Sequence, residues 1–438
     1  MIAALRTRAA LYGEGFSALF RLIGQAAPAA LRKGGLAALF ATSAAQRMAF
    51  AILRAFKPNL RLKRRLITAY ENSGTAIITR HSDVTEVLER EADFAVVYEP
   101  RMRAITGGEN FFLGMQDSAA YQHDVSLMRL IIRREDVATR LIPLVTREAA
   151  SIVAQAGDCM DVAADLTQRI PVRILAKYFG LPGPSEAVMI RWTTQMFWYL
   201  FSDLGADAAV GAAALEDATA CRLYLDGAIA ERRANPTEDD DILNRCLAMP
   251  GVDELTIRNN LTGLMIGLVP TLNKAAILAL SQLMARPEAL AAAQAAARAD
   301  DDALLAAHLF EALRFDPANP IIYRRATRDC VIARGHFRAL QIPAGTMVLA
   351  ANLSAMFDPF ALEAPREFRT DRPWGDYMLW GYGMHTCFGA HINRAVIPQM
   401  LKPLLTCANL RAEAAPDCLG TPFPAHFRVC WKAQGTPP

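Results

Sequence analysis

The most informative segment of this chain is Trp380-Gly381-Tyr382-Gly383-Met384-His385-Thr386-Cys387-Phe388-Gly389. Three glycines surround a single cysteine, and a helix-like segment from Ala390 to Leu405 follows. Glycine permits turns with positive φ and lets a flat ligand come close to the main chain. A thiolate just before a helix is stabilised by unpaired N–H groups and by the positive end of the helix dipole. These are the requirements of an axial thiolate ligand to an iron porphyrin.

An isolated cysteine is more simply explained as an inert buried side chain, but this one stands in a longer spaced motif. The run resembles the haem-binding loop of the cytochrome P-450 family, Phe-Gly-x-Gly-x-His-x-Cys-x-Gly, which an Ala-Arg pair follows. Trp380 replaces the leading Phe, and Asn393-Arg394 stands where Ala-Arg is usual; the other fixed positions match. The resemblance implies haem b as the cofactor, Cys387 as its iron ligand, and Gly381 and Gly389 as residues beside it.

A second motif, Glu311-Ala312-Leu313-Arg314, lies in a helical stretch from Asp301 to Phe315. A carboxylate and a guanidinium at i and i+3 face the same side of a helix and can pair. An ordinary surface pair would contribute less than about 1 kcal/mol. In the family this pair is buried and joins a later arginine, which falls here on Arg372. The motifs follow one another in the family's order, and the resemblance covers roughly Thr75 to the C-terminus.

The resemblance also implies the architecture. We expect a mainly α fold with a smaller β-rich region, and the haem between a long distal helix and the cysteine loop. A chain of 438 residues would by length alone suggest roughly two or three domains, but the family packs about this length into one unit. We therefore predict a basic helical extension over residues 1–58 and a single catalytic domain over residues 59–438. The hydrophobic content of 53% suits a large core around an apolar cofactor.

Charge is spread unevenly along the chain. The net charge of +3 is too small to indicate nucleic-acid binding. The first 65 residues nevertheless carry nine arginines and three lysines against one acid, Glu14, in helices that we expect to break at Gly24, Pro28 and Gly34-Gly35. A basic amphipathic segment can lie on an anionic membrane; the alternative is an extension docked on the body with its arginines in solvent. Both alternatives stay open. We expect a bacterial cytoplasmic enzyme, with or without contact to the inner face of the membrane.

The eight cysteines, at positions 159, 221, 246, 330, 387, 407, 418 and 430, show no paired metal-binding spacing. No cleavable signal peptide is visible. Scattered single cysteines of this kind indicate a reducing cytoplasm. We expect most of the thiols to act as small core side chains.

Residues 59–114 are expected to form a strand region, a helix and a loop. After strand-like residues between Asn59 and Arg80, the run Ser82-Asp83-Val84-Thr85 fits a helix start, because short polar side chains cap orphan N–H groups. A loop from Tyr98 to Gly114 is expected next. Family members use this region to shape substrate access, so Phe111 and Phe112 are candidates for the substrate pocket.

The helix expected from Ser118 to Arg134 departs from the family pattern. Family members place a His and an Arg four residues apart here to hold the haem propionates, and this chain has Tyr121 and Val125 instead. The Tyr121 hydroxyl can still donate a hydrogen bond, and Arg129 can supply a positive charge two turns further on.

Beyond Arg314 the sequence becomes strand-like. Arg324 matches the family arginine that pairs with a haem propionate, since a guanidinium binds a carboxylate through two hydrogen bonds. His385 is the matching donor in the cysteine loop. Ile321 and Ile322 are expected to line the substrate cavity.

The distal helix, expected from Asp253 to Met284, carries the largest departure. Its middle usually contains Gly-x-Asp/Glu-Thr, in which the acid and the hydroxyl deliver protons to iron-bound dioxygen. Gly267 aligns with that glycine, but Val269 stands at the acid and Pro270 at the alcohol. Pro270 has no N–H, so the carbonyl of Ile266 loses its helical partner and a kink is expected.

Two residues just beyond the proline, Thr271 and Asn273, can take over the missing polar roles. With Gly267 and Pro270 they form the predicted catalytic group of the helix. Ile266 and Val269 are further candidates for the substrate pocket.

Three functions follow from this pattern. The first is a monooxygenase that inserts one oxygen atom from O2 into a small or medium apolar substrate, with electrons from a ferredoxin and its reductase. The second is a hydroperoxide isomerase or peroxygenase on a lipid-like substrate, which needs no proton relay and no redox partner. The third, a haem-binding sensor without catalysis, is the weakest hypothesis, because a thiolate ligand is costly for mere binding.

Overall fold

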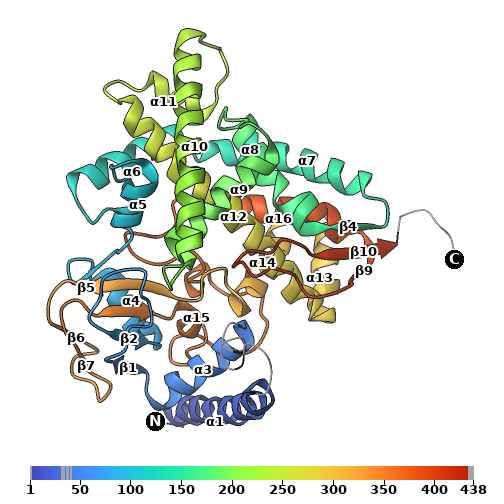
Figure 1. The fold of residues 1–438 in the computed structure, drawn as a ribbon. Helices are drawn as coiled ribbons and strands as arrows, with labels where there is room; N and C mark the ends of the chain where they lie inside the picture. The colour runs from blue at the N-terminus through green and yellow to red at the C-terminus, as the bar shows by residue number, and fades with distance from the viewer. Residues whose placement is uncertain (1, 31–34, 36–38, 40–41, 433–438) are drawn as a thin grey trace. The chain divides into compact units, whose positions relative to one another are not determined.

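The computed structural model describes residues 2–30, 35, 39 and 42–432 (Figure 1). The chain forms two compact units: the first comprises Met1–Val97 and Arg314–Cys387, the second Tyr98–Leu313 and Phe388–Pro438. Each unit has helices and a sheet of its own. The fold is mainly α with smaller β regions, as expected. The division into residues 1–58 and a single domain over residues 59–438 remains a prediction.

Unit 1 is built on a five-stranded sheet in the order β1-β2-β8-β5-β3. Its strands are β1 (Asn59–Leu62), β2 (Thr75–Ile78), β8 (Met347–Ala350), β5 (Ile322–Ala326) and β3 (Phe94–Ala95). β2 and β8 run parallel and the other pairs are antiparallel. Every residue of β8 is buried, because apolar side chains cover both faces of this central strand. A separate antiparallel pair comprises β6 (Cys330–Ile332) and β7 (Leu340–Ile342).

The helices of unit 1 are α1 (Ile2–Ala30), α3 (Ser43–Phe56), α4 (His81–Glu89), α15 (Asn352–Ala355) and the short η5 (Trp374–Asp376). α1 packs along α3. At Gly15 a Cβ would lie 2.5 Å from the Cβ of Ala55, so this glycine permits the close approach. The breaks expected at Gly24 and Pro28 are wrong, because α1 continues through both; packing along α3 outweighs their weak helical preference. Gly34 lies outside the described residues.

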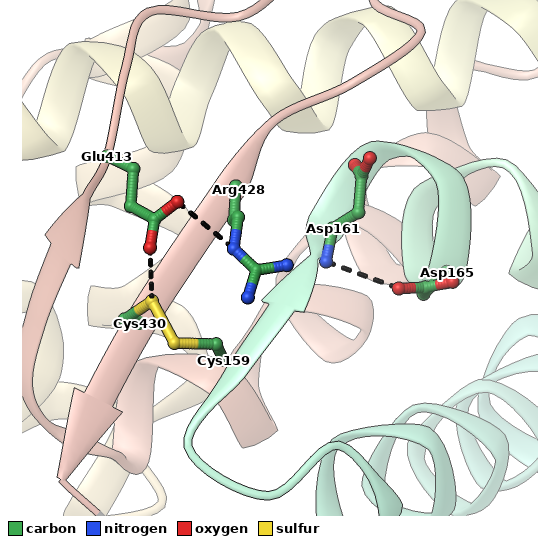
Figure 2. The surroundings of a disulfide bond; sticks show 6 residues. All are labelled: Cys159, Asp161, Asp165, Glu413, Arg428 and Cys430. Carbon is green, nitrogen blue, oxygen red and sulfur yellow. Dashed lines mark hydrogen bonds and ion pairs between the residues drawn. A yellow bond between two sulfur atoms is a disulfide. The ribbon is translucent and has the colours of Figure 1, made fainter.

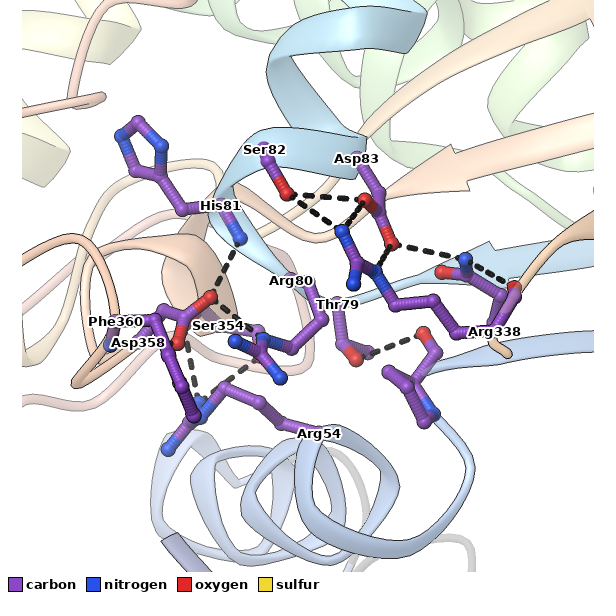
Figure 3. A network of polar contacts seen from close by, with 12 residues as sticks. Arg54, Thr79, Arg80, His81, Ser82, Asp83, Arg338, Ser354, Asp358 and Phe360 are labelled. Atoms are coloured by element: carbon purple, nitrogen blue, oxygen red, sulfur yellow. Dashed lines mark hydrogen bonds and ion pairs between the residues drawn. The ribbon is translucent and has the colours of Figure 1, made fainter. Parts of the chain in front are cut away.

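A buried arginine ties α3 to the rest of unit 1 (Figure 3). Arg54 is 2% exposed and donates to the carbonyl and the hydroxyl of Ser354, both at 3.0 Å. Its other terminal nitrogen pairs with Glu14 at 2.9 Å. The extension is therefore docked on unit 1 through α3, and its single acid is already neutralised.

The start of α4 is capped by a distant side chain. The helix begins after Arg80, which makes no side-chain cap. Instead, Asp358 accepts hydrogen bonds from the His81 N–H at 3.0 Å and from Arg80 Nε at 2.7 Å (Figure 3). The Ser82 hydroxyl donates to Asp83. The expected cap at Ser82 is thus wrong, since a tertiary carboxylate takes that role.

Unit 2 is mainly helical. Its α-helices are α5 (Glu99–Thr106), α6 (Ala119–Ile131), α7 (Ile142–Gln155), α8 (Arg169–Lys177), α9 (Glu186–Phe197), α10 (Ala208–Ala234), α11 (Ile242–Ala248), α12 (Glu254–Met284), α13 (Pro287–Arg298) and α16 (Ala390–Thr406). Shorter helical turns are η1 (Phe112–Gly114), η2 (Val137–Leu141), η3 (Val162–Thr167) and η4 (Trp198–Ser202). α14 (Asp302–Phe315) runs from unit 2 into unit 1. The loop expected from Tyr98 to Gly114 is wrong over Glu99–Thr106, which forms α5. Pro100 in its first turn favours a helix start, and Gly107 ends the helix in the left-handed region.

The core of unit 2 is α12, which contacts α8, α9, α10 and α16. Asp253 caps its first turn by accepting from the Thr256 N–H at 2.7 Å. The helix is long and apolar enough to cross a membrane by composition, but 67% of its most apolar window is buried within the protein. It is therefore a core helix.

The sheet of unit 2 has the order β4-β10-β9, with β4 (Cys159–Asp161), β10 (Arg428–Lys432) and β9 (Ala408–Ala412) all antiparallel. A disulfide joins Cys159 of β4 to Cys430 of β10 (Figure 2). The expectation of free thiols is wrong for this pair. Sequence spacing gave no sign of it because 271 residues separate the two cysteines. Cys221, Cys246 and Cys330 are buried thiols, as expected.

Candidate active site

The loop that carries Cys387 is folded on itself by backbone hydrogen bonds. The Cys387 N–H donates to the Trp380 carbonyl at 2.8 Å, and the Thr386 N–H donates to the Gly383 carbonyl at 3.1 Å. Gly381 and Gly383 have φ of +82° and +72°, the left-handed region that glycine adopts without strain. Cys387 is half-buried, and α16 begins three residues later at Ala390. The tight glycine turn that the sequence predicts is present.

The cysteine loop is fastened to the end of α4. A Cβ at Gly383 would lie 2.6 Å from the Leu88 carbonyl oxygen, so only glycine fits there. The next residue, Met384, donates its N–H to Glu91 Oε1 at 3.0 Å. At the start of the loop, the Trp380 ring stacks on Trp374 with centroids 5.1 Å apart. The tryptophan that replaces the family's Phe therefore has a packing role of its own.

Two buried arginines hold the segment from residue 363 to 367. Arg314 is fully buried and donates to the carbonyls of Met356 at 2.9 Å and Pro365 at 2.8 Å. Arg372 donates to the carbonyl of Ala364 at 2.7 Å, and both arginines reach the Glu367 carbonyl, at 3.2 and 3.0 Å. Glu311 is also fully buried. The burial fits the family pattern, and the pairing of Glu311 with Arg314 and Arg372 remains a prediction.

The remaining candidates of unit 1 lie on β5, directly before it and in the cysteine loop. Arg324 is 4% exposed and donates to the Tyr323 carbonyl at 3.0 Å. His385 is two residues before Cys387 and half-buried. Ile321 and Ile322 pack against the core, and the Ile322 Cδ1 atom lies 3.8 Å from the position of a Cβ at Gly381. Their roles toward a cofactor or substrate remain predictions.

On α12, Gly267 faces open space. A Cβ there would meet no described atom within 4 Å, whereas the neighbouring Ile266 and Val269 are 1% exposed. The helix stays helical on both sides of Pro270. The proline therefore removes the partner of the Ile266 carbonyl without ending the helix.

The polar side chains after Pro270 already have partners. The Thr271 hydroxyl donates to the Gly267 carbonyl one turn back, a common arrangement for threonine in helices. Asn273 is 3% exposed; its oxygen accepts from the Thr167 hydroxyl at 2.7 Å, and its amide donates to the Pro424 carbonyl at 2.8 Å. The Thr271 oxygen can still accept a hydrogen bond. The side-chain oxygen and amide of Asn273, by contrast, are both bonded to other parts of the fold. Sequence reasoning gave no sign of Thr167 or Pro424.

Phe111 and Phe112 are buried at 1% and 3% exposure. A Cβ at Gly263 would lie 2.3 Å from the Phe111 ring, so the ring rests directly on α12. The Phe112 ring lies 5.5 Å from that of Phe388. The four-residue spacing of Gly263 and Gly267 is the signal that could have predicted this contact, because residues at i and i+4 share one face of a helix.

On α6, the predicted propionate partners differ in exposure. Tyr121 is 5% exposed and belongs to the buried face, whereas Arg129 is exposed. Ser118 caps the helix by accepting from the Tyr121 N–H at 3.1 Å. The role of Tyr121 and Arg129 toward a cofactor remains a prediction.

Comparison with known proteins gives relatives of one kind. No family model matches the chain. It is 27% identical over 259 residues to cyclomarin C epoxidase of Salinispora arenicola and 28% identical over 261 residues to erythromycin C-12 hydroxylase of Saccharopolyspora erythraea. Each match covers 58% of this chain, and the chain spans 62% of the length of either relative. Nocardicin C N-oxygenase of Nocardia uniformis is 26% identical over 391 residues, 84% of this chain and 89% of that protein.

Solved structures agree on the fold. A cytochrome P450 of Chondromyces apiculatus superposes with a TM-score of 0.73 at 21% identity, covering 89% of this chain and 96% of that one. P450BioI in complex with an acyl carrier protein ligated to hexadec-9Z-enoic acid gives a TM-score of 0.76 at 16% identity, covering 90% and 100%. The chain belongs to the cytochrome P-450 superfamily. Its members bind haem b through a cysteine thiolate.

The residues of this chain fit that cofactor. Cys387 is half-buried on a loop whose turns require glycine. Cys159 and Cys430 are bonded to each other, and burial raises the pKa of Cys221 and of Cys246 to about 12. Those buried thiols are therefore poor thiolates. On α12, the absence of a side chain at Gly267 leaves open space beside the helix.

Proposed function

We propose that this cytochrome P-450 is a haem-thiolate monooxygenase that inserts one oxygen atom from O2 into a small or medium apolar organic substrate. The observation that carries the proposal is the glycine loop from Trp380 to Cys387, which holds one half-buried cysteine between fixed backbone turns. The named relatives, an epoxidase, a hydroxylase and an N-oxygenase, support an oxygenase over a hydroperoxide isomerase.

When bound, haem supplies the activation of oxygen, which protein side chains do not provide. The chain supplies orientation and a dry pocket. Cys387 would hold the iron, with Gly381 and Gly389 beside the ring. Arg324 and His385, with Tyr121 and Arg129, would bind the two propionates through charge-assisted hydrogen bonds.

Substrate would lie against apolar side chains. Phe111 and Phe112, Ile266 and Val269 of α12, and Ile322 of β5 with Ile321 just before it are the candidates that would exclude water from such a pocket. The shape of the pocket would then orient the substrate. A dry pocket of this kind favours apolar compounds. We propose no particular substrate, because none of these side chains can form a directional hydrogen bond.

Proton delivery would rest on Thr271. Its hydroxyl donates to the Gly267 carbonyl and could accept from a water that also donates to the Ile266 carbonyl, whose usual helical N–H partner Pro270 removes. Asn273 is held by Thr167 and Pro424, so we assign it a positioning role. Pro270 contributes by freeing the Ile266 carbonyl.

The decisive experiment measures the spectrum and the oxygen source together. The reduced holoprotein should show the red-shifted carbon-monoxide band of a thiolate ligand, and Cys387→Ala should lack it. With a ferredoxin, its reductase and ¹⁸O2, an apolar substrate should gain one labelled oxygen atom. Turnover of a lipid hydroperoxide without any reductant, together with no labelled product, would instead establish the isomerase alternative.

Electrons would come from a separate ferredoxin and ferredoxin reductase in the cytoplasm. Small electron carriers are acidic partners for basic surfaces, and association of this kind weakens with salt. We therefore expect the rate of reduction by ferredoxin to fall as ionic strength rises. A rate independent of salt would argue against a charged docking surface.

We further propose that the N-terminal helix contacts an anionic membrane. Five large apolar side chains of α1 are 42% to 72% exposed: Leu5, Tyr12, Phe16, Phe20 and Ile23. At 100° per residue they fall within an arc of about 80°. Phe56, itself 42% exposed, extends this face, because its ring lies 4.9 Å from that of Phe16. Such a stripe among twelve basic residues and one acid within the first 65 residues suits the interface of an anionic bilayer.

Vesicle binding tests this surface. The protein should sediment with phosphatidylglycerol vesicles and not with phosphatidylcholine vesicles, and salt should weaken the binding. Phe16→Ser with Phe20→Ser should reduce binding at least tenfold. Leu223→Ser is the matched control, because Leu223 is 69% exposed but lies on α10. Equal binding by both variants would refute the proposal, as would self-association through this face without lipid.

A further inference from the structure

The disulfide of unit 2 sits at the edge of a small sheet. β4 has only three residues, and Cys159 lies directly opposite Cys430 in its pairing with β10. The two Cα atoms are 4.0 Å apart. Three residue pairs make a weak ladder by themselves, and the covalent bond adds a fixed link between β4 and β10 (Figure 2).

The two sulfur atoms differ in their surroundings. Cys159 is partly exposed, whereas Cys430 is fully buried. Glu413 Oε1 lies 3.3 Å from the Cys430 sulfur, and Oε2 pairs with Arg428 at 3.0 Å (Figure 2). A disulfide sulfur has no proton to donate, so this contact becomes a hydrogen bond only when Cys430 is a thiol. The carboxylate is thus placed to accept from the reduced form, and Cys159 is the sulfur that an external thiolate can reach.

The strand that the disulfide holds leads to the distal helix. Asp161, at the end of β4, accepts from the Phe427 N–H at 2.9 Å and from the Ala164 N–H at 3.2 Å, and so caps η3. η3 ends at Thr167, whose hydroxyl donates to Asn273 of α12. Asn273 in turn donates to Pro424, in the segment that leads into β10. Asn273 is therefore linked to β4 through Thr167 and to the start of β10 through Pro424, and the disulfide joins these same two strands.

We propose that Cys159 and Cys430 form a reversible thiol–disulfide site that exchanges with a glutathione-type thiol and whose opening loosens residues 159–167 beside α12. One glutathione thiolate attacks Cys159 Sγ, and Cys430 leaves as a thiolate and takes a proton. A second glutathione thiolate then attacks the glutathione sulfur of the mixed disulfide and releases Cys159. Two glutathione thiols lose two electrons and become one glutathione disulfide, and the protein gains two thiols.

A redox titration of the holoprotein tests the site. The protein is equilibrated at fixed ratios of glutathione to glutathione disulfide, and free thiols are then tagged and counted by mass. One pair of thiols should appear together between the fully oxidising and fully reducing ends, and Cys159→Ser with Cys430→Ser should remove that transition. Cys418→Ser is the matched control, because Cys418 is a free, partly buried cysteine near the same sheet; the transition should persist in it.

Glu413→Gln tests the assigned direction of attack. The variant removes the negative charge beside the departing Cys430 sulfur and offers an N–H in its place, so glutathione should reduce it about tenfold faster. Hydrogen exchange tests the consequence. Backbone amides of residues 162–167 should exchange at least tenfold faster in the reduced protein and in the double serine variant than in the oxidised protein.

Three results would overturn the proposal. The first is a pair that stays reduced, or stays bonded, across the whole range of glutathione ratios. The second is equal hydrogen exchange in the two states. The third is binding of one zinc ion per reduced chain, which would make this a metal site, since the ligand atoms of Cys159, Glu413 and Cys430 lie within 4.8 Å of one another. None of these readouts depends on oxygenase activity.

Discussion

Replacing Gly383 by alanine tests how the cysteine loop is held. Gly383 has a φ of +72°, and an L-residue in the left-handed region costs about 1–2 kcal/mol. Its new Cβ would also lie 2.6 Å from the Leu88 carbonyl oxygen. That oxygen belongs to the backbone of a helix end and cannot turn aside, so overpacking adds about 1–3 kcal/mol. The variant should lose about 2–5 kcal/mol of unfolding free energy in total.

Gly381→Ala is the matched control within the same loop. Gly381 has a φ of +82°, but its Cβ would meet no atom nearer than 3.5 Å, an ordinary contact. This variant should therefore lose only the backbone term of about 1–2 kcal/mol. Denaturant unfolding of the two holoproteins, followed by far-UV circular dichroism, gives the difference. Equal losses in both variants would show that Gly383 does not pack against the Leu88 carbonyl and that the cysteine loop is not held to the end of α4 in this way.

Three further outcomes are expected. Arg314→Met should lose several kcal/mol in thermal unfolding, because buried carbonyls left without donors cost about 1–3 kcal/mol each; replacing Arg369, whose pair with Asp371 is partly exposed, by alanine should leave the unfolding temperature almost unchanged. Burial alone would raise the pKa of Asp136, but hydrogen bonds from Arg245 and Tyr178 outweigh it and lower that pKa. The stabilisation by Asp136 is therefore present above about pH 4 and is lost as pH falls through the lowered pKa. Asp136→Asn should reduce this loss of stability at acid pH, and an unchanged pH dependence would contradict the assignment. Thr271→Val should reduce product formed per electron pair about a hundredfold while substrate affinity stays the same, and full coupling in that variant would exclude its hydroxyl from proton delivery.

Local sequence patterns determined much of the fold. The glycine loop and the helix after it, the start of α6 after Ser118 and the start of α12 after Asp253 are all where the sequence predicts them. Each of these features depends on residues within a few positions of one another, through φ preferences and caps. The family resemblance added the cofactor and the order of the motifs, which composition alone could not supply.

Features that depend on distant partners became visible only in the folded chain. Asp358 caps α4 from across unit 1, and packing along α3 carries α1 through Gly24 and Pro28. At the candidate site, Asn273 is committed to Thr167 and Pro424, and Cys159 meets Cys430 across 271 residues. Sequence periodicity is a local signal, whereas a buried polar group takes whichever partner the folded chain brings within hydrogen-bonding distance. The sequence therefore indicated which residue types matter, but only the folded chain shows which partners they contact.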